Sequence, residues 1–214
     1  SDTVVLVRIA ERSTSLSKRA LDIGADGIIV PWMEKVEEVE EAVRDCRYPP
    51  EGRRGIGGER ATVWGQCLNE HANEANENVL VIPLIESINA VPNVANMCKV
   101  DGIDLFFFGP ADFSASAGYR GQWEGPGVAE QILELKDTIN AAGKHCGVMS
   151  TSVQNLTERR DQGFRMLALG PDSGLLMRSM HQSLQAVDCD RLPATSLDPT
   201  DGKPVSKSDT KIKK

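Results

Sequence analysis

The sequence predicts an α/β fold in which buried parallel strands alternate with helices. Its main signature is a unit that recurs over 21–31, 100–110 and 161–171: a helical stretch ends at a glycine, an apolar run follows, and a proline closes the run. The apolar residues do not alternate with polar ones, which is the pattern of strands buried on both faces. Such strands separated by helices are typical of α/β proteins. The pattern leaves open whether the sheet closes into a barrel or is doubly wound.

Six apolar runs are the predicted strands. In chain order they cover residues 4–9, 27–30, 79–85, 103–108, 146–149 and 165–169. Glycine before a run is a helix C-cap signal, and proline after a run ends the strand because proline cannot donate to the ladder.

Helices are predicted wherever apolar residues recur at helical spacing between the runs. They cover 34–46, where Val36, Val39 and Val43 share a face, the stretch after Pro126, the weaker patterns 13–21 and 90–99, and a last amphipathic segment, 175–186. Residues 48–78 are predicted to form a long irregular connection, and such connections are often functional. Its glycines do not fit a nucleotide-binding fingerprint, because Arg60 stands where the third glycine would be.

Length and composition bound the organisation. The chain has 214 residues, 40% of them hydrophobic, and a net charge of −7. This balance excludes a mostly disordered chain and argues against a general binder of nucleic acid or anionic membranes. We expect one domain over 1–187 and a polar, lysine-rich, disordered tail over 188–214. A closed eight-stranded β/α barrel usually needs about 250 residues, so the folded part is short for one.

The cysteines and the N-terminal segment bear on location. Five cysteines are widely spaced, without a C-x-x-C pair or a histidine at metal-finger spacing. An odd, scattered set of this kind suggests reduced thiols in a cytosolic protein. No signal-peptide pattern or apolar run of about 18 residues occurs, so we expect a cytoplasmic protein with no membrane span.

Polar residues at the ends of the apolar runs are the candidate site. Ligands of parallel α/β folds bind at the carboxyl ends of the strands. The first run ends in Arg8, the third in Glu86, the fourth in Gly109-Pro110-Ala111-Asp112 and the last in Asp172. We therefore expect these residues to converge on one edge of the sheet.

Glu86 and Asp112 end neighbouring predicted strands, which leaves three interpretations open. The two carboxylates could form a general acid/base pair, ligate a divalent cation such as Mg²⁺ or Mn²⁺, or cap the helices that follow. Around Asp112, proline at a first helical position and small neighbours leave backbone amides open to an anion. Arg8 could supply a charged fork for a carboxylate, or form a surface salt bridge with Glu11.

Two other chemistries are disfavoured. No lysine ends an apolar strand, which argues against an imine-forming enzyme. His71, His145 and His181 all lie away from the predicted edge, so no serine–histidine or cysteine–histidine arrangement is visible.

Several segments in this order together resemble the HpcH/HpaI aldolase family of metal-dependent class II pyruvate aldolases, which act on 2,4-dihydroxyhept-2-ene-1,7-dioate or 2-keto-3-deoxy sugar acids. They are Arg8 at a strand end, 21–31, the Tyr-Pro-Pro-Glu-Gly-Arg-Arg-Gly segment 48–55, Ile85-Glu86-Ser87, and 109–114. The resemblance covers about residues 4–186. It implies a TIM-type (β/α)8 barrel of the phosphoenolpyruvate/pyruvate superfamily, usually assembled as a homohexamer.

The resemblance also implies residue roles. Glu86 and Asp112 would ligate Mg²⁺, Mn²⁺ or Co²⁺, which chelates the ketone and carboxylate oxygens of pyruvate. The backbone of Gly109, Pro110, Ala111 and Asp112 would surround the substrate carboxylate, and Arg8 would stabilise the enolate oxygen. Asp22 matches an acidic catalytic position that reaches the site of a neighbouring subunit.

The sequence departs from the family in two places. The family has two strands ahead of the arginine-bearing strand, the second ending in Asp-x-Glu-His with an acid/base dyad, and this chain begins after that motif. Glu70-His71 lies in another segment, so the dyad's role is not carried over to it. Leu84 stands where the family has glutamine, two positions before the metal-binding glutamate.

We therefore expect a divalent-metal-dependent aldolase that cleaves or forms 4-hydroxy-2-oxo acids through a metal-bound pyruvate enolate, with an aldehyde as the second substrate. The alternatives are an enzyme similar to citryl- or malyl-CoA lyases, and a non-catalytic remnant that binds pyruvate and metal.

Overall fold

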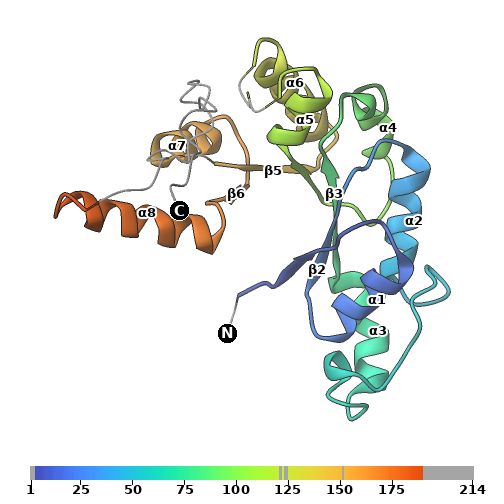
Figure 1. Ribbon diagram of the computed structural model, residues 1–214. Helices are drawn as coiled ribbons and strands as arrows, with labels where there is room; N and C mark the ends of the chain where they lie inside the picture. The colour runs from blue at the N-terminus through green and yellow to red at the C-terminus, as the bar shows by residue number, and fades with distance from the viewer. Residues whose placement is uncertain (1–2, 121, 123–124, 151, 190–214) are drawn as a thin grey trace.

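The structure is a computed structural model that describes residues 3–120, 122, 125–150 and 152–189 (Figure 1). The predicted tail over 188–214 lies outside the described residues, except for Asp188 and Cys189.

A single parallel sheet forms the centre of the fold and confirms the six predicted strands. The strands are β1 (Leu6–Arg8), β2 (Gly27–Val30), β3 (Leu80–Ile85), β4 (Leu105–Phe108), β5 (His145–Met149) and β6 (Met166–Ala168). Each pairs in parallel with the next in sequence, in the order β1-β2-β3-β4-β5-β6. A doubly wound sheet reverses its strand order at a switch point, whereas this order is that of a barrel. The sheet is a curled six-stranded part of one (Figure 1).

Helices connect the strands, and most of the predicted ones are confirmed. They are α1 (Thr14–Asp22), α2 (Val36–Cys46), α3 (Leu68–Asn78), α4 (Val94–Met97), α5 (Pro110–Ser116), α6 (Val128–Ala141), α7 (Val153–Asp161) and α8 (Asp172–Gln185), with short 3-10 turns η1 (Arg60–Thr62) and η2 (Ile88–Asn93).

Two predicted segments differ in the structure. The helix predicted over 90–99 is divided into η2 and α4. The reason is Pro92, which lies inside η2 and has no backbone N–H to donate to a continuous helix. The connection predicted to be irregular over 48–78 contains α3, an eleven-residue helix in which Ala75 is the buried residue. A helix with so small an apolar face has no visible periodicity in sequence.

The two faces of the sheet carry different apolar clusters. One face packs against α1, α2, α4, α5 and α6, which lie along its outer side in Figure 1, with Phe106, Phe108 and Ile85 fully buried there. Ile82, Leu84 and Phe107 form a second cluster on the opposite face, made of strand residues. Because side chains alternate along a strand, Glu86 and Arg8 continue the rows of this second face. No helix in the described part of the chain is long and apolar enough to cross a membrane.

Candidate active site

Three strand ends bring the predicted residues to one edge of the sheet. Arg8 is the last residue of β1, Glu86 follows β3 directly, and Gly109 follows β4 and leads into α5. β3 and β4 are adjacent and parallel, which confirms that Glu86 and Asp112 end neighbouring strands. The electrostatics of Glu86 reflect the same grouping. Burial raises its pKa, the backbone hydrogen bond from Trp32 lowers it, the charge of Asp112 raises it, and that of Arg8 lowers it.

The carboxylate of Glu86 is held from two sides. The side chain is only 4% exposed, and its Oε1 accepts a hydrogen bond of 2.9 Å from the backbone N–H of Trp32. On the other side, a Cβ built on Gly109 would lie 3.0 Å from Oε2. One oxygen is therefore fixed by the protein, while the other lies beside the bare backbone that begins α5.

The capping interpretation is wrong for these acids. Ser87 is the residue that caps η2, through a side chain that accepts a hydrogen bond from the N–H of Asn89. The N-cap of α5 is Gly109, and Asp112 lies inside the first turn with an exposed side chain. Among the described residues, neither Glu86 nor Asp112 is therefore the N-cap of a helix.

Arg8 lines the same cavity as Glu86 at this edge of the sheet. Its charge acts on Glu86, and no ion pair with Glu11 forms among the described residues, so the surface salt bridge is not formed. Arg8 and Glu86 line a cavity of about 260 Å³ together with Trp32, Met33 and Glu11, and with Ala10, Arg12, Pro31 and Glu38. A cation and a buried carboxylate therefore share one small open cavity.

The donor set fits a hard divalent ion that takes part of its ligands from elsewhere. Among the described residues, no three side chains of His, Cys, Asp or Glu gather as a metal site. Glu86 and Asp112 would supply two carboxylates, which is what Mg²⁺ and Mn²⁺ commonly take from a protein when water and substrate oxygens complete the shell.

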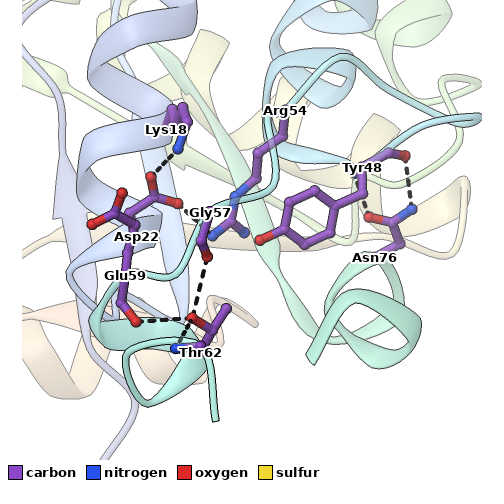
Figure 2. A network of polar contacts seen from close by, with 9 residues as sticks. Lys18, Asp22, Tyr48, Arg54, Gly57, Glu59, Thr62 and Asn76 are labelled. Atoms are coloured by element: carbon purple, nitrogen blue, oxygen red, sulfur yellow. Dashed lines mark hydrogen bonds and ion pairs between the residues drawn. The ribbon is translucent and has the colours of Figure 1, made fainter. Parts of the chain in front are cut away.

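Asp22 lies at the other end of the sheet. It ends α1, which runs back from the carboxyl end of β1 toward the start of β2, so it is distant from Glu86 within this chain. Figure 2 shows its carboxylate between Lys18 and Arg54, with Arg54 Nη2 3.0 Å from Asp22 Oδ1. Arg54 is 1% exposed, and its guanidinium lies 4.5 Å from the centre of the Tyr48 ring.

Residues of the 48–78 segment complete the network around Asp22 and Arg54. Tyr48 exchanges two hydrogen bonds with Asn76 of α3 (Figure 2). The ring of His71 lies edge-on to Tyr48, with centroids 6.0 Å apart. His71 therefore belongs to the network around Arg54 and not to the edge that carries Glu86.

Two residues near the edge were not predicted from the sequence as contacts. Trp32, which directly follows Pro31, supplies the amide that holds Glu86. The sequence signal for this contact is Pro31, which ends the strand, because the chain must turn there across the edge of the sheet. Leu84, in place of the family's glutamine, packs in the second apolar cluster, and its Cδ1 would lie 3.6 Å from a Cβ on Gly109.

Comparisons with known proteins show which proteins this chain resembles. A family model described as HpcH/HpaI aldolase/citrate lyase matches residues 1–179. A 4-hydroxy-2-oxovalerate aldolase of Rhodococcus jostii is 38% identical over 178 residues, which are 83% of this chain and 68% of the relative. A hydroxypyruvate/pyruvate aldolase of Roseobacter denitrificans is 36% identical over 84% of this chain and 70% of its own length.

A solved structure shares the fold. An HpcH/HpaI aldolase/citrate lyase family protein from Burkholderia cenocepacia superimposes with a TM-score of 0.82 at 32% identity, covering 86% of this chain and 73% of the other.

Proposed function

Because this chain belongs to the HpcH/HpaI aldolase/citrate lyase family and is thereby an aldolase-type lyase, we propose that it cleaves and forms 4-hydroxy-2-oxo acids at the edge that carries Arg8, Glu86 and Asp112. The products of cleavage are pyruvate and an aldehyde. We include in the proposal a divalent ion held by Glu86 and Asp112, and a complete TIM-type barrel of the phosphoenolpyruvate/pyruvate superfamily.

The observation that carries the proposal is that one arginine and two carboxylates lie at the same edge of the sheet, at or just after the ends of β1, β3 and β4. Breaking the bond between C3 and C4 of a 4-hydroxy-2-oxo acid leaves its electron pair on pyruvate as an enolate. A divalent ion supplies Lewis-acid stabilisation of such charge when it is bound. Arg8 adds a fixed cation, which stabilises the enolate oxygen as its charge develops.

The backbone after β4 is the proposed seat of the substrate carboxylate. Gly109 presents no side chain, Pro110 has no N–H, and the amides of Ala111 and Asp112 begin α5. The first amides of a helix have no partner within the helix and attract anions. The substrate carboxylate would thus lie next to Oε2 of Glu86.

The proton of the 4-hydroxyl group needs an acceptor, and the described histidines do not supply one. His71 contacts Tyr48, His145 begins β5 at the opposite end, and His181 lies on α8. The described residues therefore supply charge stabilisation and binding. We propose that proton transfer depends on the Asp-x-Glu-His segment that the family carries ahead of the arginine strand.

The test is a retro-aldol assay with 4-hydroxy-2-oxo acids, together with titration of oxalate, a planar mimic of the pyruvate enolate. We expect oxalate to bind only with Mg²⁺ or Mn²⁺ present, and EDTA to abolish both binding and cleavage. Cleavage that persists in EDTA would contradict the metal mechanism. Cleavage of a CoA thioester without cleavage of free hydroxy-oxo acids would favour the citryl- or malyl-CoA lyase reaction. Binding without any turnover, even in a chain that carries an Asp-x-Glu-His segment ahead of the arginine strand, would favour a non-catalytic role.

We also propose that the chain works as a homo-oligomer, a hexamer by its resemblance to the family, in which Asp22 acts near the site of a neighbouring subunit. Light scattering after size-exclusion chromatography measures the assembly. A monomer that retains full activity would contradict this part.

A further inference from the structure

Trp32 has an unusual backbone conformation at the edge of the proposed site. Its φ is 59°, in the left-handed region that bulky side chains rarely adopt, and its side chain is 50% exposed. Such a conformation costs free energy and persists where surrounding contacts enforce it, which is common at functional sites.

Two hydrogen bonds enforce the turn at Trp32. Its N–H donates to Oε1 of Glu86 at 2.9 Å, and the N–H of Met33 donates to the carbonyl of Leu84 at 3.2 Å. The chain after β2 is thus tied to the end of β3. This places the Trp32 amide on Glu86, and Trp32 lines the 260 Å³ cavity together with it.

Two charged side chains that line this cavity have partners outside it. Arg12 pairs with Glu41, and Glu38 accepts hydrogen bonds from the amides of Glu34 and Lys35. The proposed function assigns Arg8 to the enolate oxygen and Arg12 pairs with Glu41, so both lining arginines already have a role or a partner other than a carboxylate on the second substrate. Trp32, whose side chain is half exposed, is the largest apolar residue among those that line the cavity.

We propose that Trp32 determines which aldehyde the site accepts: the substituent of the aldehyde packs on the indole, so that apolar and aromatic aldehydes are preferred over those that carry a carboxylate. This inference rests on the proposed aldolase function and adds the class of the second substrate. It also makes Trp32 a positioning residue for Glu86, through a backbone N–H that substitution of the side chain leaves in place.

The test compares Trp32→Ala, Trp32→Phe and Trp64→Ala in aldol addition of pyruvate to benzaldehyde, acetaldehyde and succinic semialdehyde. Trp64 is a matched control because it is also left-handed (φ 51°) and exposed (71%), but lies in the connection beside η1. We expect Trp32→Ala to lower kcat/KM for benzaldehyde roughly tenfold, as loss of an aromatic contact does. In the same variant, kcat/KM for succinic semialdehyde should be unchanged or higher. Trp32→Phe should retain most of the parent's kcat/KM for benzaldehyde. Trp64→Ala should have the parent's kcat/KM for all three aldehydes.

A second readout does not need turnover. In a variant whose other two tryptophans are phenylalanine, benzaldehyde added to the Mg²⁺–oxalate complex should quench the fluorescence of Trp32, whereas succinic semialdehyde should not. Equal effects of Trp32→Ala on all three aldehydes, or no quenching while oxalate still binds with Mg²⁺, would overturn the inference and leave the proposed function standing. Failure of the parent chain to bind oxalate with Mg²⁺ would instead overturn the proposed function, and the inference with it.

Discussion

Gly109 lies directly against Glu86: a Cβ built on this glycine would come within 3.0 Å of both the Cβ and Oε2 of Glu86. The contact joins the ends of β3 and β4 at the place where the proposed ion and the substrate carboxylate meet. No side chain fits there unless Glu86 moves.

We therefore expect Gly109→Ala to displace the Glu86 carboxylate by a few tenths of an ångström and to weaken Mg²⁺-dependent oxalate binding about tenfold, since small displacements at a reacting centre are costly. Isothermal titration measures this. Gly58→Ala is the control, because a Cβ there would make an ordinary contact of 3.7 Å. Equal affinities of the two variants would show that the close approach at Gly109 is not needed.

The two carboxylates should be separately necessary for the ion. Glu86→Gln and Asp112→Asn each remove one charged oxygen ligand, and we expect each to lower Mn²⁺ affinity in the presence of oxalate by at least about 100-fold, beyond the 10- to 100-fold typical of changes around the ligands. Glu134→Gln, on the exposed face of α6, is the matched control. Retention of parent affinity by either site variant would remove that residue from the proposed metal site.

The Asp22–Arg54 pair should be worth more to stability than a surface pair. Arg54 is 1% exposed, so Asp22→Asn leaves a buried cation without its charged partner and should cost about 3 kcal/mol in the free energy of unfolding. The double variant Asp22→Asn/Arg54→Met should recover part of that loss. Asp161→Asn, which breaks the exposed Arg160–Asp161 pair, should cost less than about 1 kcal/mol. Urea denaturation measures all three, and equal costs for the two single variants would contradict the buried pairing.

His71 should make stability depend on pH. Burial, and then the charge of Arg54, lower the pKa of His71 in the folded chain, so unfolding takes up a proton when the pH falls through about 6.5, the ordinary value. The contribution is fully present above that pH and is lost below it. Denaturation midpoints between pH 8 and pH 5 should therefore fall less in His71→Gln than in the parent. His145→Gln controls for the loss of a histidine elsewhere, and an unchanged slope in His71→Gln would rule out this origin.

Val63 should be strained in its present conformation. It has φ 51° and ψ 49°, and a β-branched residue is poorly suited to the left-handed region. We expect Val63→Gly to raise the free energy of unfolding by about 0.5 kcal/mol, because relief of strain exceeds the added flexibility of the unfolded glycine. Thermal denaturation measures it. Val153→Gly, at an exposed helical position, should not stabilise the chain, and stabilisation by both substitutions would show that strain at Val63 is not the cause.

The sequence predicted a helix most clearly where the helix buries several apolar residues. α2 and α6 bury several apolar residues at helical spacing, and the pattern located both. α3 is attached mainly by polar contacts, such as that of Asn76 with Tyr48, and contacts between distant segments leave no local periodicity. Local pattern likewise did not decide whether Glu86 caps the helix that follows it. In the structure, Ser87 is the residue that caps η2.

The sequence by itself determined the strands, that they run parallel, and the residues at their ends, because burial on both faces requires continuous apolar runs and the carboxyl ends of parallel strands share an edge. Arg8, Glu86 and Asp112 could be grouped on that basis alone. The order of the strands in the sheet was decided by the tertiary structure. Only the tertiary structure decided that the Trp32 amide holds Glu86, that Gly109 lies against it, and that Asp22 pairs with Arg54 at the opposite end of the sheet. These contacts join residues 23 to 54 positions apart in the chain, and their geometry depends on how the elements pack and not on any local pattern.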